Sequence, residues 1–242
     1  AQPNPGVTAD ARAWGPGFWF QNQRHIYWPM MAAGDYEQFL PFFKMYTDAL
    51  PLAKRRTRTY YGHDGAFFSE TMHFWGTYLN GDCGYGWNRS GKELGLTDNG
   101  YIRRYWQGGI ELTAMMLDYF THTQDDRFAR ETLLPIAAEI MTFYDQHYKR
   151  DEKGKIRFEP AQMLETMWDV VNPAPEIAGL NCCLSGLLEL PARMTTLGHR
   201  AQWKRMLGEL PPLPKTKVGE TTVLANAEII RGGTHNIENG HL

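Results

Sequence analysis

The sequence is poor in cysteine and in net charge. Three cysteines are too few for a disulfide framework, and two of them are adjacent, Cys182 and Cys183, rather than spaced as in a CxxC metal site. The formal net charge is −2, so no basic surface indicates nucleic acid as a partner. No window approaches the roughly 18 consecutive apolar residues of a membrane-spanning helix, and we expect no membrane partner.

Strand-forming patterns are also scarce, because residues 221–224 form the only β-branched run. Apolar residues recur instead at helical spacing, above all after Asp35, which forms a capping-box pattern with Gln38. The apolar positions of this helix are Phe39, Phe42, Phe43, Tyr46, Ala49, Leu50 and Ala53. Further helices are predicted over residues 101–121, 126–148, 176–197 and 199–207, with a short aromatic one after residue 65.

The connections between these helices are long and rich in glycine or proline. Residues 80–100 form one such loop, with six glycines, and we expect it to be a lid or a cleft rim rather than a disordered surface loop. Residues 149–158 predict a turn or small hairpin, and residues 159–175 predict a loop. Helix pairs joined in this way predict an all-α fold with an α/α architecture and long functional loops at one end.

Aromatic residues are abundant, at 13% of the chain, which favours a large core, a carbohydrate-type cleft or both. The segment WFQNQRHIYW, residues 19–28, places four aromatics beside Asn22, Gln23, Arg24 and His25. Aromatic faces pack on the apolar faces of sugar rings, and forked donors bind hydroxyls and carboxylates. The alternative is a buried helix end whose polar groups satisfy one another.

Several acidic residues lie among aromatics or glycines, where glycosidic chemistry would need a proton donor and a second group. Glu70 lies in GAFFSET, where an apolar setting would raise its pKa and suit it as an acid, or it is a helix-cap residue. Glu111 follows two glycines in WQGGIEL and faces a cleft, or it is a solvated or paired helix residue. A third group, in residues 160–179, consists of Glu165, Asp169, Asn172 and Glu176.

Other catalytic signatures are missing from the sequence. It contains no GxSxG elbow, no HExxH and no P-loop. His25, His63, His73 and His235 lack the spacing of a metal motif, so we expect neither a metal nor a cofactor. The segment RGGTHNIENGHL, residues 231–242, combines glycines with polar residues, including His235. In its polar residues it resembles the acidic segment at residues 160–179.

Five segments occur in an order that resembles one group of bacterial proteins. They are QNQRHIYWPMMAAGDY, YYGHDGAFFSET, WQGGIEL, PAQMLETMWDVVNPAPEIAGL and GGTHNIEN. As a set, covering about residues 15–239, they resemble the catalytic region of proteins related to glycoside hydrolase family 95, which includes α-L-fucosidases and α-L-galactosidases. The resemblance implies a six-hairpin α/α toroid, or most of one, and an inverting mechanism with a Glu acid and a water activated by Asn residues held by an Asp.

Transfer of the family's site residues follows the motifs. The NxxxxYW element of the family matches Asn22, which implies a role on the base side, although the second family Asn is Phe20 here. Glu111 is the counterpart of the family acid, and an alternative alignment on residues 123–126 selects Asp118. The family Asp falls near NPAPEIAGL, where Asp169 and Asn172 are the nearest polar matches.

We therefore predict a glycoside hydrolase that acts on a polysaccharide or oligosaccharide. Glu111 or Glu70 would be the acid, and Asn22 with Asp169 or Glu165 would position water. The predicted substrate contacts are Trp19, Arg24, His25, Trp28, His63, Asp64, Trp87, Trp106, Trp168, Asn172 and Glu176.

The resemblance also implies a setting: residues 1–242 form a single helical catalytic domain, a piece of a larger bacterial protein. Such proteins have β-sandwich flanking domains and an extracytoplasmic location, periplasmic or secreted.

Two rival functions stay open at this point. In a polysaccharide lyase, Asn22 and Arg24 would neutralise a uronate carboxylate, while His25 or a tyrosine abstracts the proton. The other rival is a non-catalytic carbohydrate-binding fragment that retains the fold and lacks turnover.

Overall fold

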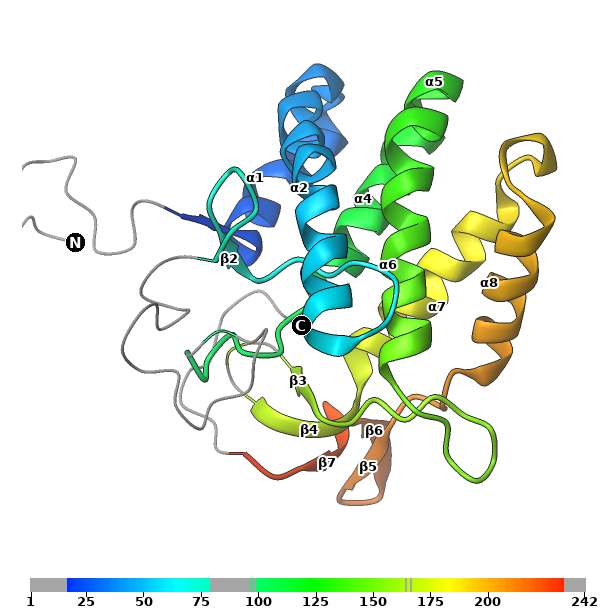
Figure 1. Ribbon diagram of the computed structural model, residues 1–242. Coiled ribbons are helices and arrows are strands. Elements are labelled where there is room, and N and C mark those ends of the chain that lie inside the picture. The colour runs from blue at the N-terminus through cyan, green and yellow to red at the C-terminus, as the bar shows by residue number, and fades with distance from the viewer. Residues whose placement is uncertain (1–16, 79–96, 98, 164, 166, 233–242) are drawn as a thin grey trace, which may run out of the picture.

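The computed structural model describes residues 17–78, 97, 99–163, 165 and 167–232, and most of them are helical (Figure 1). The main helices are α1 (Phe20–Ala33), α2 (Phe39–Tyr61), α4 (Gln107–Thr123), α6 (Leu134–His147), α7 (Ala174–Glu189) and α8 (Leu197–Glu209). The short α5 (Asp126–Phe128) and a π-helical turn, Ala129–Leu133, lead into α6. Single 3-10 turns occur at Tyr36–Gln38 and Ala192–Met194. Among the described residues, every helix is too short or too polar to cross a lipid bilayer.

The helices form two layers of hairpins. Helices α1, α4 and α7 lie side by side in one layer, and α2, α6 and α8 lie in the other. Each consecutive pair, α1–α2, α4–α6 and α7–α8, spans both layers; the rings of Tyr27 and Phe42, for example, stack at 4.1 Å. The row runs from α1 to α8 without closing into a ring in Figure 1. The structure thus shows helical hairpins of the α/α type, and ring closure stays a prediction.

The apolar stripe predicted after Asp35 is confirmed, since its seven apolar residues are all buried in α2. Asp125 caps α5, because its side chain accepts from the N–H groups of Arg127 and Phe128. Asp35 forms no such side-chain bond and precedes the 3-10 turn instead. The predicted small hairpin at residues 149–158 is present as a bridge between Arg150 and Ile156.

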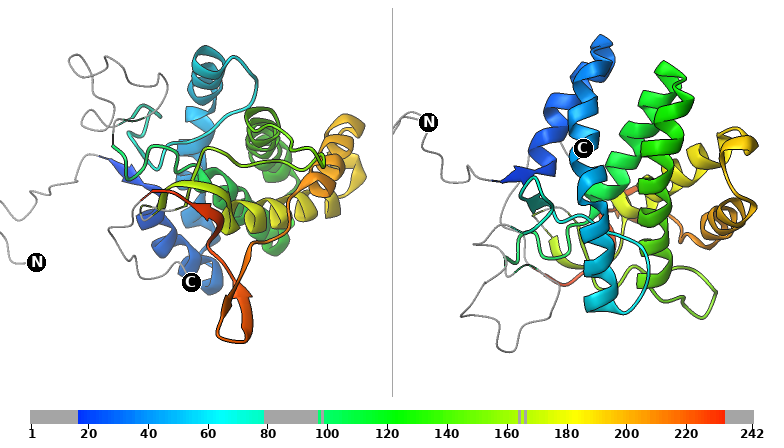
Figure 2. Two further views of the ribbon diagram at one scale, coloured as in Figure 1. Left: turned by 90° about the horizontal axis from the view of Figure 1, so that it is seen from below. Right: turned by 45° about the horizontal axis from the view of Figure 1, so that its top comes forward.

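Short strands gather at one end of the helical layers. The strands are β1 (Phe18–Trp19), β2 (Thr71–Met72), β3 (Ala161–Met163), β4 (Met167–Pro173), β5 (Lys215–Val218), β6 (Thr221–Leu224) and β7 (Ala227–Ile230). β1 pairs with β2, β4 lies between β3 and β7, and all three pairings are antiparallel. β5 and β6 form a separate hairpin that projects from the body (Figure 2). Because β1 leads directly into α1 and β4 into α7, these helices begin at the strand-bearing end.

Two predicted helices are wrong in place or kind. Residues 66–78 form no helix, since Thr71 pairs with Trp19 in the β1–β2 ribbon and Gly76 has a left-handed φ of 88°. The helix predicted from residue 101 begins at Gln107, because residues 99–105 form turns in which the N–H groups of Ile102 and Tyr105 bond three residues back.

The remaining errors lie after residue 158. The loop predicted over residues 159–175 contains β3 and β4, with Val170 and Val171 paired to β7. The helix predicted to end at residue 197 ends at Glu189, because Pro191 lacks the N–H that would continue it. Helix α8 then begins at Leu197 and runs through Gly198 to Glu209, rather than over residues 199–207.

Candidate functional site

Glu70 lies where the β1–β2 ribbon meets the first turn of α1. The backbone N–H of Phe20 donates to the Glu70 carbonyl at 2.9 Å, and the N–H of Gln21 donates to Glu70 Oε1 at 2.7 Å. Helix α1 has no side-chain cap of its own, so a carboxyl group from 49 residues away satisfies its free N–H group. The local structure therefore fixes the position of this side chain.

Burial governs the protonation of Glu70, whose side chain is 2% exposed. Burial raises its pKa well above the usual range, and the negative charges of Glu165 and Glu111 add to this effect. The Gln21 N–H and the Arg24 guanidinium act in the opposite direction without reversing it. Glu70 Oε2 has no hydrogen-bond partner among the described residues. A carboxyl group whose pKa is raised in this way is suited to act as a general acid.

Glu111 joins α4 to α1. Trp28 Nε1 donates to its Oε1 at 2.8 Å, and Arg24 Nη1 contacts its Oε2 at 3.1 Å. Arg24 and Trp28 are four residues apart on α1 and so share one face of that helix. The Glu111 side chain is 24% exposed, so this ion pair borders solvent.

The glycines before Glu111 let α4 pack closely. A Cβ added to Gly108 would lie 2.9 Å from Phe20 Cγ, and one added to Gly109 would lie 2.7 Å from Ile140 Cδ1. Neighbouring side chains, of Phe20 and Ile140, therefore occupy the space beside these glycines.

Glu165 brings a third carboxyl group from the connection between β3 and β4. It is 8% exposed, and its charge acts on Glu70. Its carbonyl accepts a hydrogen bond of 2.7 Å from Trp168 Nε1. We call Glu70, Glu111 and Glu165 the carboxylate cluster, which draws on three separate segments; Arg24 pairs with Glu111, and its charge acts on Glu70.

Four other predicted residues lie on β1, α1 and β4. Asn22 and His25 are exposed on α1, and Trp19 is half-buried in β1. Asp169 is half-buried in β4, where its carbonyl accepts from the N–H of Arg231.

Asn172 and Trp168 form contacts within the strand-bearing end. Asn172 has a left-handed φ of 50°, accepts from Phe158 N at 2.9 Å and donates to Glu228 at 2.6 Å. Trp168 meets the ring of Tyr101 edge to face at 5.0 Å.

Glu176 forms a second buried acidic site, in the first turn of α7. Gln107 Nε2 donates to its Oε1 at 2.8 Å, and burial raises its pKa to about 8. Gln107 also donates to the carbonyl of Gln162 at 3.2 Å, which ties α4 and α7 to β3.

The remaining predicted contacts lie toward α2 and α6. Trp106 is buried and packs on Phe67 and Phe143. His63 is hydrogen-bonded to His147 at 3.0 Å, and burial lowers the pKa of His147 to about 3.

Asp64 is exposed, pairs with Arg58 and borders a cavity of about 750 Å³ between α2 and α6. Trp87, like most of the predicted lid at residues 80–100 and residues 233–242, lies outside the described residues. Within the described part of the chain, no group of three or more His, Cys, Asp or Glu residues is placed to hold a metal ion.

Sequence reasoning missed Tyr46 as a neighbour of the site. It was predicted only as a core residue of α2, yet its hydroxyl donates to Gln23 Oε1 at 3.0 Å and the charge of Glu70 acts on it. A tyrosine within an apolar stripe needs a partner for its hydroxyl, which was the available signal.

Comparison with known proteins places most of this site within one family. The family model described as "Glycosyl hydrolase family 95 catalytic domain" matches residues 11–170, which include the whole carboxylate cluster. The chain is similar in structure to a "Putative kojibiose phosphorylase from human microbiome", with a TM-score of 0.59 and 15% identity. The match covers 83% of this chain and 29% of that one, and it shows a shared fold. No curated protein matches the chain.

Proposed function

Because this chain belongs to glycosyl hydrolase family 95, we propose that its carboxylate cluster hydrolyses a glycosidic bond in a polysaccharide or oligosaccharide. Glu70 is the proposed proton donor to the leaving oxygen. The observation that carries this assignment is its buried carboxyl group, which has a raised pKa and one oxygen without a partner among the described residues. A donor of this kind is what the leaving group requires.

Glu111 is suited to a different task in this scheme. Its oxygens accept from Arg24 and Trp28, so the carboxylate is fixed in place. A fixed negative charge stabilises the positive charge that develops on the sugar ring in the transition state. Asn22 with Asp169 or Glu165, as the resemblance implies, would activate water for an inverting reaction, and the proposed substrates are α-L-fucosides or α-L-galactosides.

The charges of the cluster favour an uncharged glycan over a uronate. A uronate carboxylate would lie beside several carboxyl groups, and like charges at close range repel. Arg24, which a lyase would need for charge neutralisation, already binds Glu111. This pairing supports hydrolysis over β-elimination.

A matched pair of substrates tests the role of Glu70. We expect Glu70→Gln to lower kcat/KM about 10²–10⁴-fold on a fucosylated oligosaccharide, because its leaving group needs the proton. The loss of kcat/KM in the same variant should be far smaller on 2,4-dinitrophenyl α-L-fucoside, because the leaving group of this substrate departs without a proton. Nuclear magnetic resonance of the first-formed anomer tests inversion.

The matched control is Glu131→Gln, which removes an exposed partner of Arg127. This variant should leave kcat/KM unchanged on both substrates. Equal losses on the two substrates would contradict the donor role. An unsaturated product, detected by ultraviolet absorbance, would establish the lyase instead.

The setting of the domain is also part of the proposal. The chain spans 29% of the length of the similar phosphorylase. We propose that residues 1–242 work as one helical catalytic domain within a longer extracytoplasmic protein with β-sandwich flanking domains. Fractionation of the native bacterium with an antibody to this domain would report both its location and the mass of its parent.

A further inference from the structure

Beyond the carboxylate cluster, the turn at residues 73–76 presents two aromatic side chains to solvent. Phe74 is 61% exposed and Trp75 is 50% exposed. The imidazole of His73 stacks on the Trp75 ring at 4.4 Å with an interplanar angle of 13°, and Phe74 meets that ring edge to face at 4.6 Å. One indole face is therefore backed by a ring while about half of the residue stays open.

Backbone hydrogen bonds close this turn. Gly76 N donates to the His73 carbonyl at 2.8 Å, and His73 N donates to the Thr77 carbonyl at 2.9 Å, as in a hairpin turn closed by a left-handed glycine. A Cβ at Gly76 would lie 2.7 Å from Ala49 Cβ, so the turn packs directly on α2.

Arg56 fastens the turn from the α2 side. Its side chain is 7% exposed and donates from Nη2 to the Gly76 carbonyl at 2.6 Å. The guanidinium also lies 4.4 Å from the centre of the Tyr78 ring, a cation–π contact. The exposed rings thus stand on a support that is already ordered, which lowers the entropic cost of binding.

The composition of the segment indicates the kind of ligand. Residues 66–78 contain no Lys or Arg, so they lack the charges that anionic lipids or nucleic acids bind. Clustered exposed aromatics on a soluble protein commonly mark a binding surface. A fixed, uncharged indole face matches the apolar face of a sugar ring.

The turn is also continuous with the carboxylate cluster. Trp75 follows Glu70 by five positions through β2, so their Cα atoms lie within about 18 Å of each other. A glycan held by the cluster can therefore extend to the turn.

We propose that the turn at residues 73–76 is a glycan-binding platform, with Trp75 as the stacking ring, that holds a part of the chain outside the carboxylate cluster. This inference rests on the proposed function, from which it takes the class of ligand. It assigns to Trp75 a role in the binding of oligosaccharides rather than of single sugars.

Isothermal titration tests the platform in the Glu70→Gln background, where the expected loss of about 10²–10⁴-fold in kcat/KM slows hydrolysis of the bound glycan. The probes are a fucosylated xyloglucan oligosaccharide and free L-fucose. We expect Trp75→Ala to raise the Kd of the oligosaccharide about tenfold and to leave the Kd of L-fucose within twofold. Trp75→Phe, which retains a ring, should restore most of the affinity.

The matched control is Tyr60→Ala, which removes another exposed aromatic side chain, one that lies on α2. It should leave both Kd values unchanged. An oligosaccharide Kd within twofold after Trp75→Ala, or no oligosaccharide binding in the background variant, would overturn the platform. So would a change in sedimentation without a change in Kd, which would assign the turn to protein association.

The two proposals fail in different ways. If Glu70→Gln and the unmodified chain release product equally, while Trp75→Ala still weakens binding, the donor role fails and the platform stands. If hydrolysis depends on Glu70 and Trp75→Ala binds normally, the platform fails alone.

Discussion

At the scale of single residues, two buried carboxyl groups dominate how this chain should respond to pH. Burial raises the pKa of Glu176 from 4.5 to about 8, so between these values the folded state holds a proton that the unfolded state has lost. Stability should therefore fall as pH rises through this window, by on the order of 5 kcal/mol. Urea unfolding from pH 5 to pH 9 measures the slope.

Glu176→Gln provides the control for this dependence. The amide keeps the bond with Gln107 available and cannot ionise, so the slope should flatten by the amount that Glu176 contributes. An unchanged slope in the variant would assign the pH dependence to other groups.

Glu70 should shape the pH profile of activity instead. A general acid works only while protonated, and burial raises the pKa of Glu70 well above its usual range. We expect kcat/KM to fall as pH rises through that pKa, and Glu70→Gln to lose this alkaline limb along with most of its activity. Glu111→Gln should lower the rate and keep the limb. An alkaline limb that persists in Glu70→Gln would contradict the assignment.

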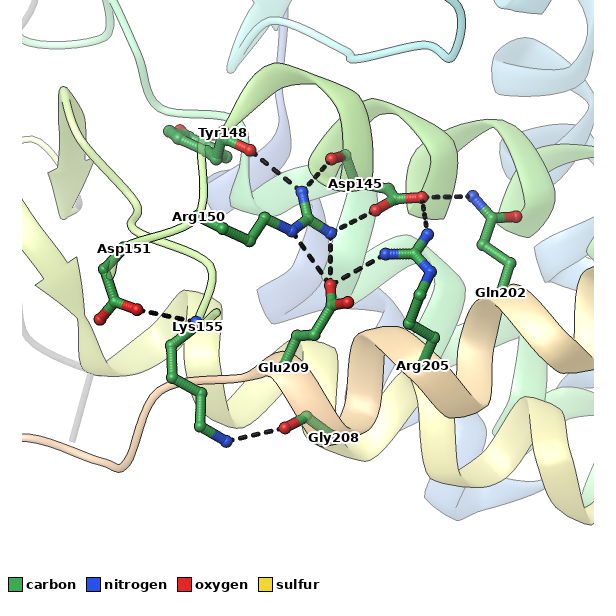
Figure 3. A network of polar contacts seen from close by, with 9 residues as sticks. All are labelled: Asp145, Tyr148, Arg150, Asp151, Lys155, Gln202, Arg205, Gly208 and Glu209. Atoms are coloured by element: carbon green, nitrogen blue, oxygen red, sulfur yellow. Dashed lines mark hydrogen bonds and ion pairs between the residues drawn. The ribbon is translucent and has the colours of Figure 1, made fainter. Parts of the chain in front are cut away.

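At the scale of elements, a charged network ties α6 to α8 and to the turn that follows α6 (Figure 3). Asp145 on α6 accepts from Arg205 at 2.6 Å and from Gln202 at 3.0 Å, both on α8. Arg150, which also pairs with Asp145, donates to Glu209 at 2.6 Å. Burial alone would raise the pKa of Asp145, but these hydrogen bonds outweigh burial and lower it.

Asp145→Asn should therefore weaken the joint between α6 and α8. It leaves two guanidinium groups short of an acceptor, and we expect a loss of about 1–3 kcal/mol in the free energy of unfolding. Glu131→Gln, which breaks the exposed pair with Arg127, should cost far less, because solvent screens exposed ion pairs. Similar losses in the two variants would mean that the network is no stronger than a surface ion pair.

Helix α2 also shows what local sequence determines. Its seven apolar positions repeat at helical spacing and are all buried, so periodicity alone located them. Residues 66–78 have no such repeat, because Phe67 and Phe68 pack on different neighbours, Trp106 and Tyr46. Their conformation depends on pairing with β1, which is about 50 residues away in the sequence. Local periodicity carries no information on such a pairing.

The candidate site, too, could be predicted from the sequence only in part. Glu70, Glu111 and Glu165 were each marked by sequence context, since each lies among aromatics, glycines or other acids. Their assembly around Arg24 depends on how α1 packs on α4 and on the connection between β3 and β4. Spacing within one element could not reveal contacts between three.

At the scale of the whole molecule, α4 holds the hairpins together. It contacts α1 and α7 within its own layer and α6 in the other. Its face toward α7 is apolar, and Cys183 Sγ on α7 lies 3.2 Å from the Ile110 carbonyl. On α7, Leu180, Leu184 and Leu187 are fully buried. The third hairpin, α7–α8, therefore covers part of the hydrophobic core.

This arrangement predicts that the stretch matched by the family model is not a stable unit. A chain ending at residue 170 would lack α7 and α8 and expose the apolar face of α4 to water. Burial of one leucine or isoleucine is worth about 1.5–3 kcal/mol, so the loss of several such contacts is comparable to the whole stability of a typical domain, about 5–15 kcal/mol. We expect residues 1–170 to show no cooperative thermal transition by circular dichroism and to elute as aggregate, whereas the full chain unfolds in one transition.

The β5–β6 hairpin offers the matched deletion. All eight of its strand residues are exposed, and it projects from the body in Figure 2. Replacing residues 215–224 with a short glycine-serine linker should move the unfolding midpoint by only a few degrees, because no core contact is lost. If residues 1–170 instead melt at the midpoint of the full chain, then α1, α2, α4 and α6 suffice as a folding unit. The third hairpin would then be an addition to a core that is complete without it.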